Sequence, residues 1–131
     1  MSKPFIDSNV VLYLLSGDAS KADKAQALLA AGAVISVQVL NEVTSVCLRK
    51  LKMPWHEIDA LLMAVKAACE VQPLTVATHD KAVELAKRFN LSFYDANIVA
   101  SALISGASTL LSEDMHDGLQ MDALVLKHPF K

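Results

Sequence analysis

Apolar residues recur along the chain in two ways, as short unbroken runs and as longer segments with apolar positions three and four residues apart. Short runs are typical of buried strands, and the longer pattern is typical of amphipathic helices. Strands are predicted at residues 4–7, 33–36, 71–76, 109–111 and 124–126.

The segments between these runs carry helix signals. Ser20 and Thr78 are suitable N-caps, Pro54 suits a first helical turn, and Gly32 and Gly106 follow the last apolar position of a periodic segment. Helices are therefore expected over residues 8–17, 20–31, 38–50, 54–68, 78–88 and 95–105. Strands that alternate with helices predict an α/β fold, with a largely parallel sheet covered on both faces.

Composition favours one compact domain spanning residues 1–131, because 53% of the residues are hydrophobic and there are only four glycines and four prolines. No apolar run approaches the roughly 20 residues of a membrane span, and no signal-peptide layout opens the chain, so a cytoplasmic protein is expected. Cys47 and Cys69 lie within apolar helical patterns and are interpreted as free thiols. A formal charge of −2 predicts no general affinity for polyanions, so a nucleic-acid ligand would need a local basic patch or metal ions.

Five carboxylates stand beside apolar sequence, where no lysine or arginine adjoins them: Asp7, Glu42, Asp95, Asp114 and Asp117. Burying an unpaired carboxylate is costly, so such a side chain must reach water or a partner. In an open α/β sheet, ligands collect at the carboxyl ends of the strands. Segments far apart in sequence are thus expected to bring these acids to one edge of the sheet.

Acids gathered in this way repel one another unless a cation neutralises them. Oxygen ligands suit a hard divalent cation such as Mg²⁺ or Mn²⁺, which can activate water and stabilise a phosphoryl oxyanion. Metal-assisted phosphodiester hydrolysis is the reaction that follows. Taken singly, each signal has a structural alternative: Asp95 as a helix cap, Glu42 as a solvated helix flank, and residues 114–118 as a turn.

Four segments also resemble the PIN-domain family, especially its VapC-type toxin ribonucleases, in order and spacing. They read Phe5-Ile6-Asp7-Ser8-Asn9, Ser36-Val37-Gln38-Val39-Leu40-Asn41-Glu42, Tyr94-Asp95-Ala96-Asn97-Ile98-Val99-Ala100 and Leu111-Ser112-Glu113-Asp114-Met115-His116-Asp117-Gly118. The resemblance implies a three-layer α/β/α sandwich around a mostly parallel sheet of about five strands. It also implies Mg²⁺- or Mn²⁺-dependent cleavage of single-stranded RNA.

Through this resemblance, the family's catalytic and metal-binding acids fall on Asp7, Glu42, Asp95 and Asp114. Asp117 matches a further metal-site acid that only some members have. Small polar residues expected to orient ligands or water fall on Asn9, Ser36 and Ser112. Many members form homodimers and are neutralised by a small antitoxin protein, so both partners are expected here.

Other functions stay open at this stage. A phosphotransfer protein on a similar sheet fits poorly, because a haloacid-dehalogenase-like phosphatase needs an acid at position 9, which is Asn9, and a receiver needs adjacent acids on its first loop. A non-catalytic binding module with the same fold is the main alternative. His116 is interpreted as a turn residue or a substrate contact, and Arg49, Lys50 and Lys52 as solvated helix ends or RNA guides. The apolar segment from Met53 to Leu62 is interpreted as core or as a partner contact.

Overall fold

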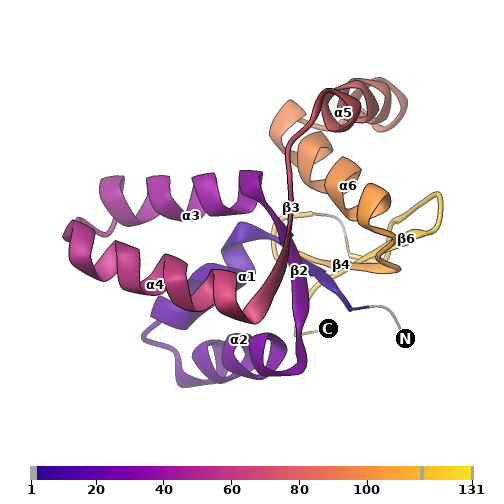
Figure 1. Ribbon diagram of the computed structural model, residues 1–131. Coiled ribbons are helices and arrows are strands. Elements are labelled where there is room, and N and C mark those ends of the chain that lie inside the picture. The colour runs from indigo at the N-terminus through magenta and orange to yellow at the C-terminus, as the bar shows by residue number, and fades with distance from the viewer. Residues whose placement is uncertain (1–2, 116, 131) are drawn as a thin grey trace.

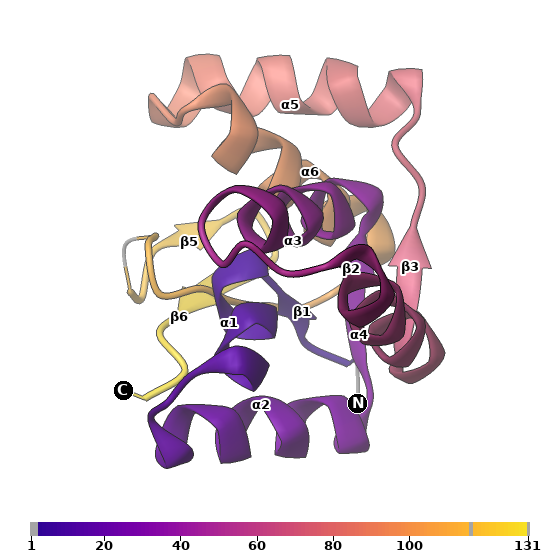
Figure 2. The same ribbon diagram turned by 90° about the vertical axis from the view of Figure 1, so that its left-hand side faces the viewer.

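The structure, a computed structural model, describes residues 3–115 and 117–130 and contains a six-stranded sheet with strand order β3-β2-β1-β4-β6-β5 (Figures 1 and 2). All strands run parallel except β5, which pairs antiparallel with β6. The strands are β1 (Phe5–Ile6), β2 (Ala33–Ser36), β3 (Cys69–Gln72), β4 (Thr109–Leu111), β5 (Gln120–Met121) and β6 (Leu124–Lys127). The mostly parallel sheet is confirmed, with one strand more than the expected five.

Helices cover both faces of this sheet (Figure 1). Helices α1 to α4 lie on one face, and α5 packs on α6 on the other. The helices are α1 (Ser8–Leu12), the 3₁₀ turn η1 (Tyr13–Leu15), α2 (Ala19–Ala31), α3 (Val37–Arg49), α4 (Trp55–Ala68), α5 (Val76–Phe89) and α6 (Phe93–Ser105). The three-layer α/β/α architecture predicted from sequence is therefore confirmed. No helix in the described ranges is both long and apolar enough to cross a membrane.

Two N-caps named from the sequence differ from the observed ones. The N-cap of α2 is Asp18, whose carboxylate accepts from the backbone N–H of Ser20 at 3.0 Å. The N-cap of α5 is Thr75, and Thr78 completes a capping box with it. Ser20 and Thr78, the predicted caps, therefore lie in the first turn of their helices. The prediction chose the wrong residue because two suitable capping residues stand close together in each segment.

Strand β3 begins and ends earlier than its apolar run suggested. Its register with β2 pairs Ala33 with Cys69 and Ser36 with Gln72. Pro73 follows directly and has no N–H to donate to a neighbouring strand. Pairing with β2, together with this proline, therefore sets the limits of β3 at residues 69–72.

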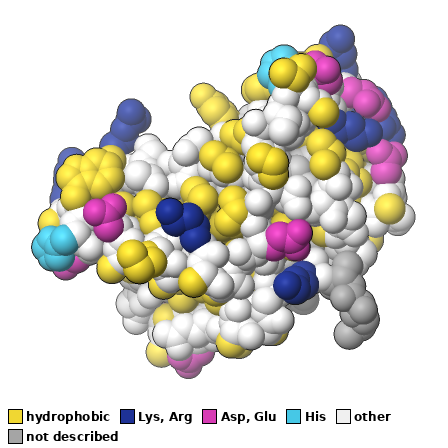
Figure 3. All heavy atoms as spheres, viewed as in Figure 1, with side chains coloured by type: hydrophobic (Ala, Val, Ile, Leu, Met, Phe, Trp, Pro, Cys, Tyr) yellow, Lys and Arg dark blue, Asp and Glu magenta, His cyan; other side chains and the backbone are white. Residues whose placement is uncertain are grey.

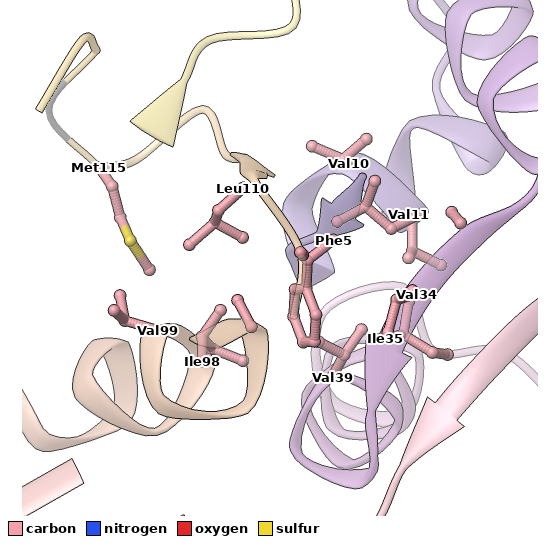
Figure 4. Packing of buried hydrophobic residues seen from close by; sticks show 14 of the residues in the cluster. Phe5, Val10, Val11, Val34, Ile35, Val39, Ile98, Val99, Leu110 and Met115 are labelled. Carbon is pink, nitrogen blue, oxygen red and sulfur yellow. The ribbon is translucent and has the colours of Figure 1, made fainter. Parts of the chain in front are cut away.

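The core surrounds the two-residue strand β1 (Figure 4). Phe5 is fully buried and pairs with Val34 on one side and Leu110 on the other. In this view Val39 of α3 and Ile98 of α6 lie on the side toward which the Phe5 ring points, and Val10 of α1 lies on the other side. Because β1 is central and buried on both faces, the residue that follows it starts at the carboxyl edge of the sheet with little access to water.

Candidate functional site

Asp7 follows β1 directly and is only 4% exposed. Its Oδ1 accepts from the backbone N–H of Ser8 at 2.7 Å, and its Oδ2 accepts from the Ser112 hydroxyl at 2.9 Å. Burial raises the pKa of Asp7 to about 6; these two hydrogen bonds oppose the rise, and the charges of Glu42 and Asp95 add to it. A carboxylate in this position ionises at neutral pH at a free-energy cost, which a nearby cation would remove.

Glu42 lies on α3, one and a half turns after the N-cap Ser36. Its Oε1 accepts from the Ser8 hydroxyl at 2.8 Å, and its Oε2 accepts from the Gln38 amide at 2.9 Å. Ser8 Oγ also lies 3.5 Å from Asp7 Oδ1. Ser8 therefore links the acid that follows β1 to the acid on α3.

Asp95 is in the first turn of α6, where the aligned backbone N–H groups favour a negative charge. Its own N–H donates to the N-cap Ser92 at 3.2 Å. Partial burial raises the pKa of Asp95, and the charges of Glu42 and Asp114 raise it further, against the lowering effect of Ser92. Asp95 thus lies close enough to two of the other predicted site acids for their charges to affect its pKa.

Asp114 lies in the exposed loop after β4 and is held by Asn9. The Asn9 side-chain N–H donates to Asp114 Oδ2 at 3.0 Å, and Asn9 Oδ1 accepts from the backbone N–H of Glu113 at 3.1 Å. The Asp114 N–H donates to Ser112 Oγ at 3.2 Å. Asn9 and Ser112 therefore connect the loop that carries Asp114 to the buried carboxylate of Asp7.

The remaining sequence-predicted residues have other surroundings. Ser36 is fully buried and its hydroxyl accepts from the Val39 N–H at 3.3 Å, so it starts α3 and does not contact the acids. Asp117 is exposed, and its Oδ1 accepts from the backbone N–H of His128 at 2.7 Å. No described contact joins Asp117 to the other four acids, so its predicted role as a metal ligand stays a prediction. The substrate contact considered for His116 lies outside the described residues.

The four acids brought together here, Asp7, Glu42, Asp95 and Asp114, take part in no ion pair within the described ranges. No lysine or arginine in the described part of the chain therefore balances their charge. Among the described residues, no three Asp, Glu, His or Cys side chains are close enough together to coordinate one ion directly. Mg²⁺ typically binds through one or two carboxylates and keeps several waters, so the donor set fits a hydrated Mg²⁺ or Mn²⁺ ion.

The family model for the PIN domain matches residues 5–116, which span β1 to the loop after β4. The chain belongs to the PIN-domain family. No curated protein matches this PIN domain in sequence.

Solved structures show the same fold. A toxin–antitoxin complex from Klebsiella pneumoniae contains a chain that superposes with a TM-score of 0.74 at 20% identity, with 98% of each chain covered. VapBC2 from Rickettsia felis, bound to a DNA fragment from its promoter, gives 0.69 at 18% identity, covering 95% of this chain and 96% of the other. VapC20 of Mycobacterium tuberculosis, a toxin that cleaves the sarcin–ricin loop, gives 0.64 at 20% identity, covering 81% and 85%.

A pocket of about 490 Å³ opens beside the acids of this PIN domain and is lined by Gln38, Asn41, Glu42, Ser45 and Tyr94. Sequence reasoning did not assign Ser8, Gln38 or Tyr94 to the site. Gln38 stands four residues before Glu42, a spacing that places the two side chains next to each other on a helix. Ser8 and Tyr94 each adjoin a site acid in sequence, but only the fold shows that Ser8 bonds to Glu42 and that Tyr94 lines the same pocket as Glu42.

Proposed function

We propose that this PIN domain is a metal-dependent endoribonuclease that hydrolyses phosphodiester bonds of single-stranded RNA, as the toxin of a toxin–antitoxin pair. The observation that carries the proposal is the gathering of four acids at the carboxyl edge of the sheet, where they pair with no described lysine or arginine. Asp7, Glu42, Asp95 and Asp114 come from four separate segments. Nearby acid charges raise the pKa of Asp7 and that of Asp95, in addition to the effect of burial. Such a cluster repels RNA unless a cation is present.

Asp7, Glu42, Asp95 and Asp114 would hold Mg²⁺ or Mn²⁺, which when bound supplies an acidified water and stabilises the charge that develops on the phosphoryl oxygens. Asp7 is the fixed member of this set, because burial and two hydrogen bonds hold both of its oxygens. Asp114 is exposed and forms the outer side of the cluster, where substrate and solvent enter.

The neighbouring polar residues orient these ligands. Ser8 restricts Glu42, Ser112 restricts Asp7, and Asn9 fixes the loop that carries Asp114. Hydrogen bonds of this kind around metal ligands set ligand geometry and basicity. The sequence therefore supplies an oriented donor set before an ion binds.

The proposed partners follow from the relatives. The similar Klebsiella pneumoniae chain is part of a toxin–antitoxin complex, and VapC20 is a toxin that cleaves the sarcin–ricin loop. We accordingly propose a small antitoxin as the protein partner, a homodimer as the assembled form, and the cytoplasm as the location. A short neighbouring reading frame that encodes a basic DNA-binding protein would support the antitoxin, and light scattering of the purified protein measures the assembly.

A cleavage assay tests the activity directly. Purified protein is incubated with end-labelled single-stranded RNA in Mn²⁺ or Mg²⁺, with EDTA as the metal-free arm, and compared with Asp7→Asn, Asp95→Asn and the exposed control Asp23→Asn. We expect cleavage by wild type and Asp23→Asn only, and only with metal. Equal cleavage by Asp7→Asn, or RNA binding without any cleavage by wild type in Mn²⁺, would refute the catalytic assignment, and the second result would identify a non-catalytic binding module.

A further inference from the structure

The pocket beside Glu42 lies between one face of α3 and the first turn of α6. Its α3 residues are Gln38, Asn41, Glu42 and Ser45. They are spaced as i, i+3, i+4 and i+7, so they form one polar stripe along the helix. Viewed as in Figure 1, the surface is notched between α3 and the start of α6 (Figure 3).

Tyr94 forms the α6 side of this pocket and is 69% exposed. Within the described ranges it makes no hydrogen bond and no ring contact. Its neighbour Phe93 differs, because that ring packs edge-on against His79 with centroids 5.5 Å apart. Tyr94 therefore presents a large planar group to the pocket that no described part of the chain covers.

The polar stripe offers hydrogen-bonding groups opposite this ring. Gln38 is engaged with Glu42, but the Asn41 amide forms no hydrogen bond with any described residue. It therefore has both a donor and an acceptor available side by side. The charge of Glu42 in the same wall disfavours a phosphate group, so the pocket suits a planar, uncharged and polar ligand.

We propose that this pocket binds one unpaired nucleobase of the RNA, next to the phosphodiester that is cleaved. The base stacks on Tyr94, and Asn41 hydrogen-bonds to its edge and selects among bases. Bases of single-stranded RNA are recognised in this way, by stacking on aromatic rings and by hydrogen bonds to their edges. The inference rests on the proposed RNA substrate. Glu42 lines the pocket and Asp95 follows Tyr94 in sequence, so the pocket adjoins the acids that would act on the phosphate.

RNA binding without cleavage tests the stacking role. In an Asp7→Asn background, the dissociation constant for a short fluorescent single-stranded RNA is measured by anisotropy. Tyr94→Ala is expected to raise this constant about tenfold, the effect typical of removing one stacked base. Tyr94→Phe, which keeps the ring, and Phe93→Ala, the adjacent exposed aromatic outside the pocket, are expected to change it less than about twofold.

A second assay tests base selection in proteins with Asp7 intact. Sequencing the products from a random-sequence RNA pool gives the base preference around the cleaved bond. Asn41→Ala is expected to weaken the preference at one position, while Tyr94→Ala raises KM at every sequence.

The outcomes separate this inference from the proposed function. Cleavage by wild type with no change of affinity or KM in Tyr94→Ala would overturn the base pocket and leave the nuclease standing. Tyr94-dependent RNA binding without cleavage would support the base pocket and refute the nuclease. If wild type and Asp7→Asn both fail to bind single-stranded RNA, both proposals fall.

Discussion

Asn9 donates to Asp114 Oδ2 at 3.0 Å although the two residues are 105 positions apart in sequence. The same side chain accepts from the backbone N–H of Glu113, so it holds both the carboxylate and the backbone of the loop. Later in the same segment of the chain, the Tyr13 hydroxyl donates to the Glu113 carboxylate, which also pairs with Lys21 at 3.6 Å. The first helical segment of the chain thus fixes the loop that follows β4.

Replacing Asn9 should therefore affect metal use more than folding. We expect Asn9→Ala to raise the Mn²⁺ concentration needed for half-maximal cleavage about 10- to 100-fold, the usual effect of losing a group that orients a metal ligand. Its bonds are partly solvent-exposed, so the free energy of unfolding should fall by only about 1 kcal/mol. Metal titration of cleavage and urea unfolding measure the two effects, with Gln26→Ala, an exposed amide on α2, as the control. An unchanged metal requirement would remove Asn9 from the site.

The raised pKa of Asp7 predicts how stability depends on pH in EDTA. The folded state holds the Asp7 proton up to about pH 6, whereas the unfolded chain releases it near 3.8. This difference in proton binding raises the free energy of unfolding. The contribution is complete below pH 3.8 and is lost as pH rises through about 6, a change of about 3 kcal/mol. Asparagine does not ionise, so the stability of Asp7→Asn does not include this pH-dependent contribution. The difference in unfolding free energy between Asp7→Asn and wild type should therefore shift in favour of the mutant between pH 3.8 and about 6 and then stay constant. Urea unfolding of both proteins from pH 3.5 to 7.5 measures the difference, and a difference independent of pH would contradict the assignment.

Divalent ions should reverse this penalty at neutral pH. A cation that binds the folded acids but not the unfolded chain stabilises the protein by an amount that grows with the logarithm of its concentration once that concentration exceeds its Kd. We expect Mn²⁺ or Mg²⁺ to raise the Tm of wild type at pH 7.5 and to change that of Asp7→Asn much less. Equal Tm shifts in the two proteins would indicate ion binding elsewhere.

Asp117 is the acid whose surroundings favour a structural role. Its Oδ1 accepts from the His128 N–H, and asparagine offers an oxygen acceptor in the same place. Asp117→Asn is therefore expected to cleave RNA and respond to Mn²⁺ as wild type does, while Asp117→Ala loses about 1 kcal/mol of stability. Parallel cleavage and metal titrations with Asp7→Asn decide the question, since a loss of about 10- to 100-fold in Asp117→Asn would return the residue to the metal site.

The sequence predicted those parts of the fold that local chemistry determines. Strands 33–36 and 109–111 were placed correctly, because each is a short apolar run with a polar serine at or after its end. The strand Gln120–Met121 was missed, because two residues carry no periodicity and pair only through β6. Its turn also requires Asp122 in the left-handed conformation, at φ 54°, which residue type alone does not indicate.

For the candidate site, the sequence indicated a set of acids to expect at one edge of the sheet but none of the contacts between their side chains. Placement after strands indicated that Asp7 and Asp114 would share an edge of the sheet. The position of the Ser8 hydroxyl between Asp7 and Glu42 depends on how α1 packs against α3. No spacing in the sequence specifies that packing. Likewise, Ser36 was grouped with the site by motif, whereas its buried position makes it the cap of α3.

The pairing of β1 with β4 has a consequence for the order of events during synthesis. Phe5 leaves the ribosome more than a hundred residues before its partner Leu110. The pairing of the central strand, and with it the surroundings of Asp7, cannot be completed until β4 has emerged, because a growing chain folds only with the segments already available. A nascent chain interrupted before β4 would therefore carry three of the four acids without the assembled edge of the sheet, so the activity proposed here would arise only after β4 has been synthesised.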